Sequence, residues 1–223
     1  MYNVRVERSA GYAGIAFVVV GIIATFLTGI TPTTSASSSE ITAYLAGMHV
    51  RWLIAAWLVF PALAFFLWFI VQLRAFLRLV PGEDDGLPAY MVATGIVAAV
   101  FLLIVTLIEV ALGSRLAADI APAALPTLWD LFNAGDALFL MPVAVMIFAA
   151  SHSARRHGSM PAWAVYWGYF AALTCALSSI SIFFRSGFFT LGGAGSLLLG
   201  GIPFAIWVIL TSLILIGRPR SNV

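Results

Sequence analysis

The 223-residue sequence contains no lysine, and all eleven of its basic residues are arginines. A lysine nucleophile and a retinal-type Schiff base are therefore excluded, because both need an ε-amino group. The sequence has one cysteine, Cys175, in an apolar stretch, so intramolecular disulfides and paired-thiol redox chemistry are excluded as well. We expect Cys175 to be a small, buried, apolar residue.

Charged residues are scarce, at 9% of the chain, whereas hydrophobic residues make up 62% and the mean hydropathy is +1.06. A soluble domain is typically about half apolar, so this composition indicates an integral membrane protein. About 20 apolar residues are needed to cross a bilayer. The sequence predicts an all-α polytopic bundle, a single six-helix transmembrane domain over residues 1–223, with spans at about 10–30, 52–73, 89–113, 127–150, 161–184 and 196–216.

The arginines are distributed unevenly about the predicted spans. Eight lie on the side of the termini and three on the opposite side, so the positive-inside rule predicts cytoplasmic termini in a bacterial cytoplasmic membrane. The first group is Arg5, Arg8, Arg74, Arg78, Arg155, Arg156, Arg218 and Arg220, and the second is Arg51, Arg115 and Arg185. Since the arginines form no patch, we expect no nucleic-acid partner; the expected partners are the bilayer and a hydrophobic small molecule, and a homo-oligomer is compatible with the composition.

The longest predicted connection runs from Thr31 to Arg51 on the outer side. Ser37 and Glu40 have the spacing of a capping box, which predicts a short helix on the membrane surface that continues into the second span. Such a segment would either roof a cavity or serve as a solvated connector, and the sequence does not separate the two.

Prolines and glycines interrupt several predicted spans. Pro61, Pro142 and Pro203 fall inside the second, fourth and sixth spans, where proline removes a backbone hydrogen bond and bends the helix, although membrane helices also tolerate it. A glycine group at the start of the sixth span predicts close helix contact or a broken segment. Its members are Gly192, Gly193, Gly195, Gly200 and Gly201.

Three acidic residues in or beside the spans are the strongest indication of function, because carboxyl groups are costly in hydrocarbon. The helix rise puts Glu109 about one turn below the outer surface, Asp130 near that surface, and Asp136 roughly 13 Å deep. Asp130, Asn133 and Asp136 follow at three-residue intervals and are expected to line one wall. We predict that the three acids are catalytic, with Asp136 protonated and the other two paired with arginines.

Residues around the acids are predicted to bind a substrate. Thr106 shares the helix face of Glu109 and is expected to donate a hydrogen bond to it. The three outer arginines are expected at the rim of an outward-facing polar pocket. Alternatively, the acids only tie the helices together. The predicted binding set is Asn133, Thr106, Arg51, Arg115, Arg185 and Trp129.

Aromatic residues are plentiful, and most fit an interfacial or lipid-facing position, with Trp52 and Trp129 as outer anchors. Rings that face inward would instead stabilise a carbocation. The histidines lie at the ends of spans without paired haem ligands within them, so haem b is not expected. The sequence therefore predicts neither a cofactor nor a metal site.

The fourth span reads WDLFNAGDALFLMPVAV, and after a basic loop MPAWAVYWGYFAAL opens the fifth. With these segments the chain resembles a group of uncharacterised six-span bacterial membrane proteins that are frequent in actinobacteria; this resemblance implies a fold and no activity. The chain is more loosely similar to small integral membrane terpene cyclases, which use acidic residues to start cyclisation of a prenylated substrate. That resemblance implies an acidic role for Glu109, Asp130 and Asp136.

The leading functional hypothesis is a metal-independent membrane enzyme, an isomerase or lyase of isoprenoids, that uses Asp136 to protonate an olefin or epoxide in a prenyl chain. A proton-coupled transporter or export component would use the same acids as a relay. However, the fourth span continues beyond Asp136 as LFLMPVAVMIFAA, which is apolar and favours a closed pocket. A third hypothesis is a non-catalytic scaffold or partner subunit.

Overall fold

The computed structural model describes residues 4–78, 86–114, 121, 123–184 and 187–217, and within these ranges the chain is helical without strands. Six helices are long and apolar enough to cross a membrane, which confirms the predicted number of spans. The long helices are α1 (Val4–Thr28), α2 (Ser38–Leu77), α3 (Leu87–Ser114), α4 (Leu125–His157), α5 (Ala162–Ser179) and α7 (Ile202–Gly217).

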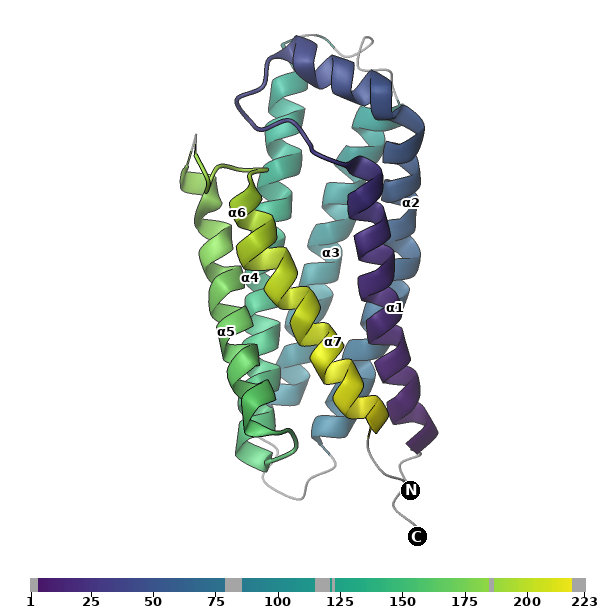
Figure 1. Cartoon of the computed structure of the whole chain (residues 1–223), viewed down its shortest axis with the longest axis vertical. Helices are drawn as coiled ribbons and strands as arrows, with labels where there is room; N and C mark the ends of the chain where they lie inside the picture. The colour runs from purple at the N-terminus through teal and green to yellow at the C-terminus, as the bar shows by residue number, and fades with distance from the viewer. Residues whose placement is uncertain (1–3, 79–85, 115–120, 122, 185–186, 218–223) are drawn as a thin grey trace.

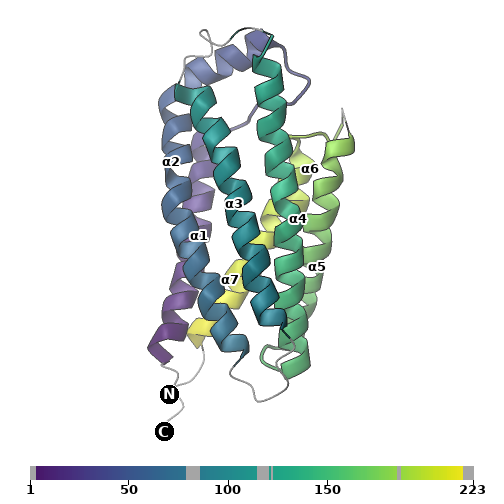
Figure 2. The same cartoon turned by 180° about the vertical axis from the view of Figure 1, so that it is seen from behind.

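Successive long helices run in opposite directions and pack side by side (Figure 1). Helix α7 lies against both α1 and α5 and closes the bundle, while α2, α3 and α4 follow one another on the face seen from behind (Figure 2). The start of α1 and the end of α7 share one end of the bundle, which we call the terminal end. The α1–α2 connection lies at the other end, the capped end. That the terminal end faces the cytoplasm stays a prediction.

Helix α2 is longer than a bilayer requires. It begins at Ser38, crosses the capped end of the bundle and then turns down between α1 and α3 (Figures 1 and 2). The predicted capping box is confirmed: the Ser37 hydroxyl accepts from the Glu40 backbone N–H, and the Glu40 carboxylate accepts from the Ser37 backbone N–H at 2.7 Å. The surface helix and the second span are therefore one continuous element that contains Pro61.

The sixth span starts irregularly, which confirms the prediction from its glycines. A short helix α6 (Ala194–Ser196) leads into a π-helical turn at Leu197–Gly201 and then into α7. A Cβ atom on Gly200 would collide with Leu140 of α4, so glycine permits the close approach of the two segments. The buried thiol of Cys175 donates to the Gly200 carbonyl at 3.5 Å.

The middle of the bundle and its terminal half are packed mainly with apolar side chains, together with the buried hydroxyl groups of Ser151, Ser153, Thr211 and Ser212. Gly95 of α3 packs so closely that a Cβ atom there would lie 2.7 Å from Ile70 Cδ1 of α2 and 3.0 Å from Met146 Sδ of α4. The fully buried residues of this larger core include Phe69, Ile70, Leu73, Phe76, Met91, Met146, Ile147 and Val208. A separate, smaller cluster forms at the capped end.

Candidate functional site

Glu109 on α3 and Asp136 on α4 are brought together by a close contact between their helices. A Cβ atom on Gly135 would lie 2.6 Å from Val105 Cγ2, so these two positions lie at one level. From this common level and a helix rise of 1.5 Å per residue, Glu109 lies about 7 Å nearer the capped end than Asp136. Helical side chains lean toward the start of their own helix, so in these antiparallel helices the two carboxyl groups lean toward each other.

Asp136 faces the inside of the bundle and is nevertheless exposed. The positions one and two turns away on its helix face, Trp129, Asn133, Leu140 and Val143, are all buried, whereas the Asp136 side chain is exposed. Asp136 therefore lies on the inward face of α4 without being packed over by its neighbours.

Glu109 is only 8% exposed and lies within electrostatic range of Asp136. Its backbone carbonyl accepts a hydrogen bond from the Trp52 indole N–H at 2.8 Å, which fixes α2 against this part of α3. We call Glu109 and Asp136 the carboxylate pair. Two carboxylates this near each other repel when both are ionised.

Four aromatic residues cover the carboxylate pair on the side of the capped end. Trp52 and Trp129 stack with ring centroids 5.7 Å apart, and Tyr44 meets both edge-on at 5.7 and 5.8 Å. Phe132 packs on both tryptophans at 5.4 and 5.6 Å. We call these four residues the aromatic cap.

The positions of the two tryptophans correct the interpretation of Trp52 and Trp129 as interfacial anchors. Both side chains are 0% exposed. The prediction was wrong because position at the end of a span does not reveal that the α1–α2 connection folds over it: the Trp129 indole donates to the Pro32 carbonyl of that connection at 3.1 Å. Sequence reasoning also missed Tyr44 and Phe132 as neighbours of the site.

A second aromatic group lies on the other side of the pair. Leu140 is one turn beyond Asp136 and meets Gly200, and Phe204 follows Gly200 by one further turn. Phe204 packs against Phe17 of α1 at 5.8 Å and against Phe66 of α2 at 6.4 Å. This trio belongs to the larger apolar core, so packed apolar side chains follow Asp136 toward the terminal end.

The other predicted polar residues have different surroundings. The Thr106 hydroxyl donates to the Leu102 carbonyl at 2.8 Å, so the predicted bond to Glu109 is wrong: a helical threonine satisfies its hydroxyl on its own backbone. Buried Asn133 donates to the Trp129 carbonyl at 2.8 Å, and its Oδ1 lies against Gly192. Asp130 is exposed near the start of α4. Of the three α4 residues, Asn133 is buried and Asp130 and Asp136 are exposed, and a wall shared by all three stays a prediction.

Of the three arginines predicted at the rim of the pocket, the structure describes Arg51. Arg51 is exposed, and within the described ranges it forms no ion pair with a carboxylate. Arg115 and Arg185 lie outside the described residues.

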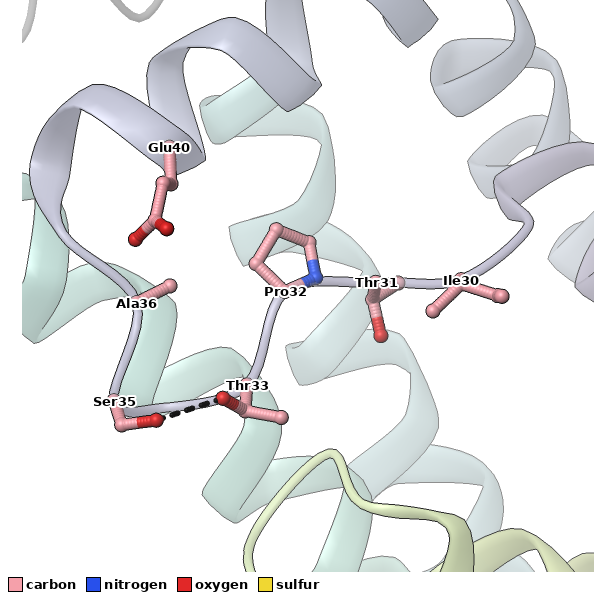
Figure 3. Close-up of a pocket in the computed structure, with 7 residues that line it drawn as sticks. All are labelled: Ile30, Thr31, Pro32, Thr33, Ser35, Ala36 and Glu40. Atoms are coloured by element: carbon pink, nitrogen blue, oxygen red, sulfur yellow. Dashed lines mark hydrogen bonds between the residues drawn. The ribbon is translucent and has the colours of Figure 1, made fainter.

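A hollow of about 380 Å³ opens on the α1–α2 connection, above the aromatic cap (Figure 3). Its wall carries hydroxyl groups and one carboxylate, and the Thr33 and Ser35 hydroxyls bond to each other at 2.9 Å. The backbone and hydroxyl hydrogens of Ser37 hold the pKa of the Glu40 carboxyl below its ordinary value of 4.5. We call this space the connection hollow; its lining residues are Ile30, Thr31, Pro32, Thr33, Ser35, Ala36 and Glu40.

Comparison of the chain with protein-family models, with curated proteins and with solved structures gave no match.

Proposed function

We propose that the protein is an integral membrane enzyme that protonates a lipid-soluble substrate, with Asp136 as the general acid. The observation that carries this proposal is the exposure of an inward-facing carboxyl group beside a buried second carboxyl group. A proton shared in a water-poor environment is poised for transfer to a weak base such as an alkene or epoxide.

Glu109 keeps Asp136 in its acidic form in this proposal. When one member of a close pair is ionised, its charge disfavours ionisation of the other. Within the described ranges neither carboxylate forms an ion pair with an arginine that would stabilise the charged form. Asp130, which is exposed and apart from the pair, is not assigned a catalytic role.

The proposed reaction is acid-initiated cyclisation of a prenyl chain. The O–H bond of Asp136 breaks as a C–H bond forms on the terminal alkene, or as an O–H bond forms on an epoxide oxygen whose C–O bond opens, and the chain carbon becomes a cation. Internal double bonds attack this cation, and the last cation passes a proton from carbon back to the Asp136 carboxylate, which restores the acid. Phe17, Phe66 and Phe204, whose rings pack on one another toward the terminal end from Asp136, are the aromatic residues that would stabilise such a cation.

The packing toward the terminal end favours this closed site over a transporter. A proton-coupled transporter needs a polar route to both sides of the membrane. Beyond Leu140 the described inner faces of α2, α4 and α7 instead carry mostly apolar side chains, among them Phe69, Ile147 and Val208. The buried polar residues there, Ser151, Ser153, Thr211 and Ser212, carry hydroxyl groups and no carboxyl group.

The test is an assay of purified protein with a panel of polyprenyl alkenes and epoxides, read by mass spectrometry. We expect a product that Asp136→Asn abolishes, with a loss of roughly 10²-fold or more. Asp130→Asn is the matched control, because it removes an exposed carboxylate from the same helix, and it should leave the product unchanged. A product that persists in Asp136→Asn, or no product from the whole panel, contradicts the catalytic role.

A further inference from the structure

Helices α1 and α7 touch near the terminal end and separate toward the capped end (Figures 1 and 2). In the touching part, Gly14 of α1 packs directly against the Ser212 side chain of α7. Further along, the rings of Phe17 and Phe204 pack at 5.8 Å. Beyond these contacts, none of residues 19–28 of α1 is buried.

The separation leaves the inward face of α1 uncovered in its second half. Gly21 and Thr25 lie two turns beyond Gly14 and Val18, which are buried, and so continue the same helix face. A Cβ atom on Gly21 would meet no atom within 4 Å, and the Thr25 side chain is exposed. The face that packs on α7 near the terminal end therefore has no such neighbour here.

Asp136 lies at the depth of this uncovered stretch. Thr25 follows Phe17 by eight residues, which places it about 12 Å nearer the capped end. Asp136 and Phe204 are each four residues from the contact between α4 and Gly200, on opposite sides of it, so Asp136 is also about 12 Å nearer the capped end than Phe204. Because the two phenylalanine rings pack on each other, Thr25 and Asp136 share one level, and both are exposed.

Contacts among three segments lie on the capped side of this stretch. A Cβ atom on Gly192 would lie 2.5 Å from Asn133 Oδ1 and 3.8 Å from the Pro32 carbonyl oxygen. The segment before α6 thus meets both α4 and the α1–α2 connection, to which Trp129 also donates. We call the uncovered stretch between residues 19–28 and residues 197–202 the α1–α7 opening.

Both edges of the α1–α7 opening are uncharged. Residues 9–28 and 194–217 contain neither an arginine nor a carboxylate. On the second edge Leu197, Leu198 and Ile202 are 50%, 48% and 42% exposed. Within the bilayer such edges meet hydrocarbon chains, whereas a charged headgroup would have to give up its hydration without an opposite charge on either edge.

We propose that an uncharged polyprenyl chain enters through the α1–α7 opening from the bilayer and reaches Asp136 from the side. The proposal rests on the proposed function in that Asp136 is the acid that the chain meets. It adds the direction of entry and assigns Gly21 and Thr25 as the residues that admit the chain.

The test is photolabelling of the full-length protein in lipid vesicles with a polyprenyl alcohol that carries a diazirine on its chain. Labelled residues are located by mass spectrometry. We expect label on residues 19–28 and 197–202 above the level at Ile104 and Leu107, which are exposed on α3 and report contact with bulk lipid. Unlabelled polyprenyl alcohol should displace this label, whereas oleic acid at the same concentration should not.

Gly21→Leu should lower the labelling of the opening by roughly tenfold, because its side chain occupies the place of the ligand. Gly47→Leu is the matched control, since Gly47 is also a helical glycine with no atom within 4 Å of a Cβ position, and it lies in the first part of α2. Thr25→Phe fills the opening from a second position and should act as Gly21→Leu does. Size-exclusion chromatography identifies a variant that does not fold.

The outcomes separate this proposal from the proposed function. If residues 19–28 are labelled only as strongly as α3, if both filling variants label as wild type does, or if oleic acid displaces the probe equally, the entry of a polyprenyl chain here is wrong. Asp136→Asn should keep the label, because it removes the acid and not the opening. A label that persists while the product assay fails would contradict the catalytic role alone.

Discussion

Asp136 shows how much a single side chain depends on its neighbours. Its sequence position predicts a deep carboxyl group, but whether that group is packed, lipid-facing or open depends on three other helices. The structure places it on the inward face of α4, near Glu109, and leaves its side chain exposed. A carboxyl group on the lipid face would cost free energy without gaining a partner.

Trp129 provides a test of the aromatic cap at the residue scale. Trp129→Ala should destabilise the protein by about 3–5 kcal/mol, because it removes a fully buried ring, its stacking on Trp52 and its bond to the Pro32 carbonyl. The measurement is the free energy of unfolding in mixed detergent micelles.

Trp57→Ala is the matched control for this experiment. Trp57 is 65% exposed on α2, so we expect its removal to change the free energy by less than about 0.5 kcal/mol. Equal losses in the two variants would contradict the contribution of the aromatic cap to stability.

At the scale of the element, α2 decides the shape of the capped end. Its capping box starts the helix outside the bundle, and the chain then continues without a break through Pro61 to Leu77. The first part of α2 supplies Glu40 to the connection hollow and Tyr44 to the aromatic cap. One helix thus contributes to both the connection hollow and the aromatic cap.

Removal of the Ser37 N-cap should destabilise the first turn of α2. We expect Ser37→Ala to lower the local stability of residues 38–42 by about 1 kcal/mol, because a backbone N–H loses its acceptor. Amide hydrogen exchange of this segment measures the change. Ser35→Ala in the same connection is the control, since the Ser35 hydroxyl bonds to Thr33 and caps no helix; an equal effect there would contradict the role of the box.

The same box predicts a pH dependence. The pKa of Glu40 is lowered below 4.5 by its hydrogen bonds from Ser37. A carboxyl group with a lowered pKa stabilises the folded state above its unfolded pKa, and this contribution is lost as the pH falls through the lowered value. The exchange difference between wild type and Glu40→Gln should therefore be present at neutral pH and disappear in acid.

At the scale of the molecule, the six spans place the start of α1 and the end of α7 together. The arginine distribution predicts that this end is cytoplasmic. On a Cys175→Ser background, Ser35→Cys should react with a membrane-impermeant maleimide in intact cells, whereas Ala162→Cys at the start of α5 should react only after permeabilisation. Both replaced residues are exposed, so the opposite pattern would invert the topology.

The sequence by itself determined the class of protein, the number of spans, the capping box and the irregular start of the sixth span. Each of these follows from local composition or spacing: a run of apolar residues must become a helix in hydrocarbon, and Ser37 lies three residues before Glu40 whatever surrounds them. The glycines beside Leu140 likewise indicate close packing before any partner is known.

Only the tertiary structure decided which polar and aromatic residues meet. Trp52 and Trp129 come from different helices and stack because the α1–α2 connection folds over them. Thr106 bonds to its own helix and Asp130 turns to the surface, although sequence spacing put both beside the acids. The physical reason is that the rotation of each helix is set by close contacts such as Gly135 on Val105, which join residues far apart in the chain.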